Sequence, residues 1–193
     1  MAKLESSLKN MILCLFLISM VMSAALGLVY NVTKGPIELA SKKGEIDALK
    51  VVLPEFDNDP TKEAKEIDGL TYYIGTKSGQ TVGYAVKTFT DKGFSGRFDL
   101  MVGLLPDGTI NNIAVLSQKE TPGLGDKMKT NWKDQFKGKN PKDFKLLVKK
   151  DGGDVDAITA STISSRAFCD ATQKAYDGYM KNYPQQETEG GQK

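Results

Sequence analysis

A cluster of hydroxyl side chains near the carboxyl end of the chain is the strongest candidate for chemistry. Five of them occur within seven residues: Thr159, Ser161, Thr162, Ser164 and Ser165. They stand directly before a segment whose periodicity predicts a helix over residues 162–182. A helix start exposes unpaired N–H groups and a partial positive charge, so phosphate is a natural ligand there. Ordinary capping by Thr159 or Ser161 explains the same residues without any ligand, and both interpretations stay open.

The residue types that are missing narrow the chemistry further. The chain contains no histidine, which excludes Ser-His-Asp and Cys-His catalysis, histidine-ligated haem and ordinary zinc hydrolase chemistry. Its two cysteines, Cys14 and Cys169, cannot supply the four thiolates of a usual iron–sulfur cluster. Redox work by this chain would therefore need an organic cofactor.

Three segments together resemble one known family. Residues 159–164 resemble the flavinylation motif Ser-Gly-Ala-Thr-x-Ser/Thr of FMN-binding domains, with Ala160 and Ser161 in place of the usual glycine and alanine. Upstream, the segments Gly93-Phe94-Ser95-Gly96 and Glu120-Thr121-Pro122-Gly123-Leu124-Gly125 resemble the family in the same order. Such domains occur in the G subunit of Rnf complexes and in the C subunit of sodium-pumping NADH:quinone reductases. The resemblance covers about residues 71–181.

The resemblance implies that FMN is joined through its phosphate to the hydroxyl of Thr162. It implies a wider set of cofactor-binding residues: Ser95, Glu120, Thr121, Gly123, Leu124, Asp156, Thr159 and Ser161. In this set Glu120 and Thr121 would bond ribityl or ring heteroatoms, and Leu124 would cover a ring face. The segment 120–125 is also a plausible plain turn, whatever it binds. Because no histidine can activate Thr162, the resemblance implies a magnesium-dependent flavin transferase that uses FAD and releases AMP.

An uncharged apolar run over residues 11–30 predicts a transmembrane anchor. Twenty residues of helix extend about 30 Å, the thickness of the hydrocarbon core of a bilayer. A cleaved signal peptide is the competing interpretation, with Ser23-Ala24-Ala25 as its cleavage site. The flanking lysines are nearly balanced, so the default for a short tail places residues 1–10 in the cytoplasm and the soluble part outside.

The remainder predicts an α+β fold, an antiparallel sheet with packed helices. Residues 31–69 read as a helical linker with a helix over 38–53, residues 70–183 as the FMN-binding domain, and residues 184–193 as a disordered tail. Alternation and turn residues predict strands near 70–74, 82–86, 97–104, 109–116 and 144–149, and a helical turn around Trp132 and Phe136. In the last helix an apolar stripe is expected: Ile163, Ala167, Ala171, Ala175 and Tyr179.

Charge gives no sign of a nucleic-acid partner. The net charge is +2, and the lysines that crowd residues 127–150 are interrupted by acidic and apolar residues, which favours a solvated surface over a polyanion site.

The family resemblance implies an electron-transfer subunit of an Rnf-type complex in the bacterial inner membrane, which is not catalytic alone. It also implies that the domain lies on the periplasmic side and that other membrane subunits are its partners. The C subunit of the quinone reductase and a non-redox anchored module are the alternatives.

Overall fold

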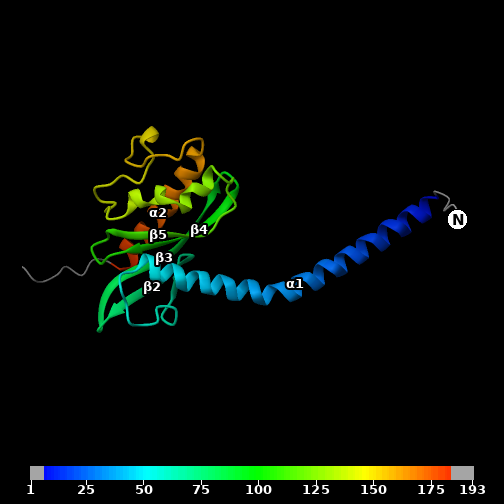
Figure 1. Ribbon diagram of the computed structural model, residues 1–193, viewed down its shortest axis with the longest axis horizontal. Helices are drawn as coiled ribbons and strands as arrows, with labels where there is room; N and C mark the ends of the chain where they lie inside the picture. The colour runs from blue at the N-terminus through cyan, green and yellow to red at the C-terminus, as the bar shows by residue number, and fades with distance from the viewer. Residues whose placement is uncertain (1–6, 184–193) are drawn as a thin grey trace, which may run out of the picture. The chain divides into compact units, whose positions relative to one another are not determined.

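The computed structural model describes residues 7–183 (Figure 1). The expected disordered tail and the first six residues of the expected cytoplasmic tail lie outside this range. By its internal contacts the chain divides between Lys43 and Gly44 into two units.

The first unit consists of most of helix α1, Leu8–Val52. It is the one helix among the described residues that is long and apolar enough to cross a membrane. The helix expected over 38–53 is present as the last part of α1, which continues without a break from the apolar run through Pro36. It ends at Val52, ahead of Pro54, since the residue before a proline disfavours the helical conformation.

The second unit is built on a five-stranded antiparallel sheet whose strands follow one another in order. The strands are β1 Lys65–Ile67, β2 Leu70–Lys77, β3 Gln80–Gly93, β4 Gly96–Leu104 and β5 Ile110–Ser117. The turn between β2 and β3 has positive φ at Ser78 and Gly79, as a two-residue hairpin requires. Strand β1 was not expected, because only three residues pair at the sheet edge. The α+β class is confirmed.

The prediction of a strand over residues 144–149 was wrong. Its residues alternate between exposed and buried, but only Val148 forms a bridge, to Val155. The chain then turns into the 3-10 helix η3, Lys149–Asp151. Two more 3-10 helices lie between β5 and the last helix: η1 Gly125–Lys129 and η2 Asn131–Phe136, the second where a helical turn was expected.

Both faces of the sheet are covered within the second unit. Residues 44–52 of α1 pack against one face, where Leu49 and Val52 meet Tyr73 and Met101. Gly103 is needed there, because a Cβ at this position would lie 2.0 Å from the Val52 carbonyl oxygen.

Helix α2, Thr162–Asn182, packs on the opposite face of the sheet (Figure 1). Four residues of the expected stripe are buried: Ala167, Ala171, Ala175 and Tyr179. Ile163 was wrongly placed in it, because this side chain is half exposed and lines a surface cavity at the head of α2.

Candidate flavin site at the head of helix α2

The amino end of α2 is open. Ser161 occupies the N-cap position, yet its side chain makes no capping hydrogen bond. The first backbone bond of the helix runs from the Ser165 N–H to the Ser161 carbonyl, at 3.0 Å. The N–H groups of the first turn, residues 162–164, are therefore left for an external acceptor. The first turn also carries no acidic residue that would compete for them.

The loop that enters α2 is held by a hydroxyl other than the expected cap. The Ser165 hydroxyl donates to the Ser161 carbonyl at 3.0 Å and accepts from the Ile158 N–H at 2.9 Å. Between these contacts Ala160 has φ of 61°, in the left-handed region that glycine enters without strain. The backbone thus gives a physical reason for the glycine that the family motif usually has at this position.

Glu120 joins the three motif segments. This side chain is 5% exposed, and its carboxylate accepts the Ser164 hydroxyl at 2.8 Å and the Ser95 N–H at 3.2 Å. Two glycines leave room for it, because a Cβ at Gly93 would lie 2.6 Å from Oε1 and a Cβ at Gly125 would lie 2.7 Å from Oε2. The carboxylate therefore fixes the β3–β4 turn and the 120–125 loop against the first turn of α2.

A cavity of about 330 Å³ opens beside this junction. Five of the predicted site residues line it: Glu120, Thr121, Leu124, Ser161 and Thr162. Sequence reasoning did not include the other five: Phe94, Gly125, Ala160, Ile163 and Ser164. All five lie inside the motif segments, so their position was a usable signal, although Ile163 had been assigned to the core stripe.

The remaining predicted residues lie outside the lining of this cavity. Ser95 reaches it indirectly, through its bond to Glu120. Gly123 has φ of 76° and shapes the loop. Thr159 is exposed.

Asp156 holds the loop that precedes α2. Its carboxylate pairs with Lys149 at 2.7 Å, and its N–H donates to the Gln135 side chain at 2.7 Å. Its carbonyl accepts the Trp132 indole N–H at 2.6 Å. Asp156 thus ties the loop to η2 and η3 from outside the cavity.

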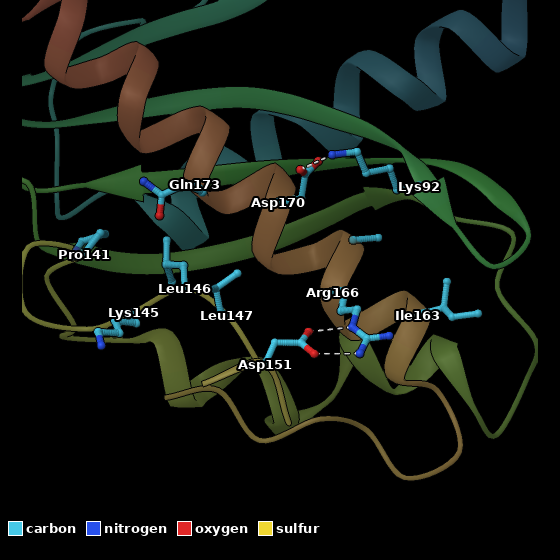
Figure 2. A pocket seen from close by; sticks show the side chains of 11 residues that line it. Lys92, Pro141, Lys145, Leu146, Leu147, Asp151, Ile163, Arg166, Asp170 and Gln173 are labelled. Atoms are coloured by element: carbon cyan, nitrogen blue, oxygen red, sulfur yellow. Dashed lines mark hydrogen bonds and ion pairs between the residues drawn. The ribbon is translucent and has the colours of Figure 1, made fainter. Parts of the chain in front are cut away.

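A larger groove of about 780 Å³ begins at Ile163 and follows α2 (Figure 2). Arg166 forms two bonds to Asp151, at 2.7 and 2.8 Å, and Lys92 pairs with Asp170. The bond from Arg166 holds the pKa of the Asp151 carboxyl below its usual value. The rest of the wall is mostly apolar, with Pro141, Leu146, Leu147, Ile163 and Ala167 beside Lys145 and Gln173.

The residues at the helix head fit a flavin nucleotide. Unpaired N–H groups and the partly buried Thr162 suit a phosphate, which helix amino ends bind by charge and hydrogen bonding. Phe94, Leu124 and Ile163 border the cavity with exposed apolar surface, which suits a planar aromatic ring.

Comparisons with known proteins point to one family. The family model described as FMN-binding domain matches residues 93–177. The chain is 36% identical over 185 residues to the G subunit of the Na(+)-translocating ferredoxin:NAD(+) oxidoreductase complex of Acetobacterium woodii, covering 87% of this chain and 89% of that one. It is 33% identical over 190 residues to the G subunit of the ion-translocating oxidoreductase complex of Shewanella baltica, covering 88% and 90%.

Among solved structures, the C subunit of the Na(+)-translocating NADH-quinone reductase from Parabacteroides distasonis aligns with a TM-score of 0.47 at 21% identity, over 68% of this chain and 78% of that one. The extent and identity of the two sequence matches decide the assignment: this chain belongs to the family of G subunits of ion-translocating oxidoreductase complexes, whose FMN-binding domain it contains.

Proposed function

We propose that this chain is a membrane-anchored flavoprotein subunit of an ion-translocating ferredoxin:NAD oxidoreductase complex, and that it relays electrons through FMN joined to Thr162. The observation that carries the proposal is the position of Thr162. It is the first residue of α2, where the N-cap side chain leaves the helix end open, and it lines the cavity beside the 120–125 loop. Relatives that match most of the chain are named as G subunits of such complexes.

The attachment requires another enzyme. Thr162 Oγ1 would attack the FMN-side phosphorus of FAD, forming the Thr–O–P bond as the bond to the bridging oxygen breaks. AMP leaves with that oxygen, and the hydroxyl proton passes to a base of the transferase or to solvent. The chain has no histidine to act as that base, so a magnesium-dependent flavin transferase is the proposed maturation partner.

The chain's own residues would hold and shield the nucleotide. The N–H groups of residues 162–164 donate to the phosphate, and Thr121 and Ser161 lie within the same cavity to bond it or the ribityl chain. Leu124 and Phe94 exclude water from a ring face. Glu120 positions the loop, since both of its carboxylate oxygens are already engaged. When bound, FMN supplies reversible electron transfer, which these side chains cannot perform.

The apolar part of α1 would anchor this domain in the inner membrane as a single span, with the domain on the periplasmic side. A covalent tether suits that compartment, because dissociated flavin would be lost by diffusion. The other membrane subunits of the complex are the proposed partners, and they should copurify with the chain.

The test uses the full chain made together with a flavin transferase. After denaturing electrophoresis, wild-type protein should show flavin fluorescence in its band, and Thr162→Val should show none. Thr81→Val is the matched control, because this exposed threonine of β3 lies outside the motif segments and the cavity lining, and it should keep the fluorescence. A fluorescent Thr162→Val band, or a colourless wild-type band, would contradict the proposal.

A further inference from the structure

Apart from Ile46 and Val51 of α1, the exposed large apolar side chains of the second unit gather at one place. Between Leu53 and Tyr183 the described structure exposes four large apolar side chains: Phe94 at 68%, Leu147 at 52%, Ile163 at 50% and Leu124 at 39%. Each of them lines the small cavity at Thr162 or the groove beside it. Single exposed apolar residues scattered over a surface need no explanation, but a cluster at one site marks a contact surface.

The apolar surface extends beyond the small cavity. Ile163 borders both hollows, and the groove continues along α2 as far as Gln173, about 15 Å of helix. Leu147 forms a wall of this groove and is not part of the cavity at Thr162 (Figure 2). A flavin held beside Leu124 and Phe94 would therefore leave Leu147 and the groove for contact with another molecule.

Positive charge surrounds this apolar surface. Residues 127–150 contain nine lysines and two aspartates in a chain of net charge +2, so the rest of the chain is net negative. Six of the lysines are exposed and form no ion pair with another residue of the range 7–183: Lys127, Lys129, Lys137, Lys139, Lys145 and Lys150. Three of these lie next to the hollows.

These three lysines are placed by the loops around the head of α2. Lys127 follows Gly125 of the cavity lining, and Lys145 lines the groove. Lys150 precedes Asp151, whose carboxylate binds Arg166 of α2. The segment that carries them, yellow-green to yellow in Figure 1, lies beside the orange start of α2. We call the four apolar residues and these three lysines the docking surface.

We propose that the docking surface receives a redox protein that presents a carboxylate-rich face around its own electron-carrying group. The inference rests on the proposed function, because only a flavin at Thr162 gives such a partner a reason to dock here. An apolar centre with a charged rim is the usual composition of a protein interface, and an interface of few residues suits a transient electron-transfer encounter. The rim lysines would steer the partner and raise its rate of association, typically by about 10- to 1,000-fold.

Other polyanions fit the surface less well. A nucleic acid would need aromatic platforms among the lysines, and Trp132 and Phe136 are packed against Phe168 instead. An anionic membrane surface would explain the lysines, but it gives no reason for the apolar residues to gather at the Thr162 cavity and the groove beside it. Electron transfer does, because it requires close approach of the second cofactor.

The test measures how fast the reduced, flavin-loaded full chain reduces two forms of one carrier. Native cytochrome c is basic, and succinylated cytochrome c carries carboxylates in place of its ammonium groups. In stopped-flow mixing at low ionic strength, the succinylated form should react at least about tenfold faster than the native form. High salt should remove the difference, since it screens charges at the surface. The triple variant Lys127→Glu, Lys145→Glu, Lys150→Glu should abolish or reverse the preference.

A control triple variant, Lys62→Glu, Lys65→Glu, Lys77→Glu, changes the net charge equally and should leave the preference intact. These residues are exposed. Lys77, the last residue of β2, pairs with Gln80 at the start of β3, about 40 Å along that strand from Gly93. Leu147→Ser should slow the reaction with the succinylated carrier at every salt concentration, because it removes apolar contact without changing charge.

Equal rates with the two carriers, or an unchanged preference in the lysine triple variant, would overturn the docking proposal. An unchanged preference is also the result expected of a surface that serves only to bind lipid. These outcomes are distinct from failure of the proposed function, which would appear earlier as wild-type protein that carries no covalent flavin.

Discussion

The packing around Glu120 leads to a specific prediction for Gly125→Ala. A methyl group at this position would lie 2.7 Å from Glu120 Oε2 and 2.8 Å from Ser164 Oγ. The carboxylate cannot retreat, because Gly93 closes its other side so tightly that a Cβ there would lie 2.6 Å from Oε1. The substitution must therefore displace the glutamate or the first turn of α2.

The expected cost follows from two contributions. Overpacking a tight site costs about 1–3 kcal/mol. Loss of the bond from Ser164 to the carboxylate adds about 1–2 kcal/mol, because a buried charged acceptor would lose a partner. We expect the free energy of unfolding to fall by roughly 2–5 kcal/mol, and the Tm by roughly 5–20 °C for a domain of this size.

The assay is thermal unfolding of the full chain in detergent, followed by near-ultraviolet circular dichroism. Gly123→Ala is the control, because nothing lies within 4 Å of its Cβ position and only its φ of 76° opposes the change. That variant should lose about 1 kcal/mol. A wild-type Tm for Gly125→Ala, or a greater loss in Gly123→Ala, would refute the packing argument.

Four further predictions concern single residues. Glu120→Gln should fold and lose about 1–2 kcal/mol in urea unfolding, since a neutral amide accepts hydrogen bonds less strongly than a carboxylate, while Glu120→Ala should lose more. Ala160→Gly should gain about 0.5–1 kcal/mol by relieving the φ of 61°, and an unchanged or lowered Tm would count against strain there. In a Cys14→Ser background, Cys169 should resist Ellman's reagent at about pH 8 until the protein unfolds. The reason is that burial raises the pKa of its thiol to about 12. Rapid labelling of the folded protein would contradict this prediction. Burial raises the pKa of Tyr179 from 10.0 to about 12, so the unfolded chain releases this proton at a lower pH than the folded chain does. The free energy of unfolding should therefore fall as the pH rises from 10 to 12. Tyr179→Phe should lessen that fall, and an equally steep fall in the variant would contradict the argument.

The sequence predicts most of the sheet and the last helix for local reasons. Ser78-Gly79 and Pro106-Asp107-Gly108 punctuate alternating strands, so their positions follow from turn chemistry. Four-residue spacing of small apolar residues defines α2. The error at 144–149 has a tertiary cause, because alternation alone does not reveal whether a partner strand exists.

The candidate site was predictable as a set of segments but not as a set of contacts. The motifs alone are enough to single out Thr162 and the 120–125 loop. Glu120, however, meets residues 25 and 44 positions away, Ser95 and Ser164, and no local pattern encodes pairings at that distance. Asp156 stands at the motif's acidic position, yet its carboxylate pairs with Lys149 outside the cavity. Sequence spacing alone cannot tell this structural ion pair from direct contact with a ligand.

Intact-mass spectrometry of the full chain tests the attachment at Thr162 most directly. Protein isolated from its native membrane should be heavier than the sequence mass by one FMN less one water, and peptide mapping should place the whole increase on the segment that contains Thr162. An unmodified mass, or an adduct on another residue, would contradict the account.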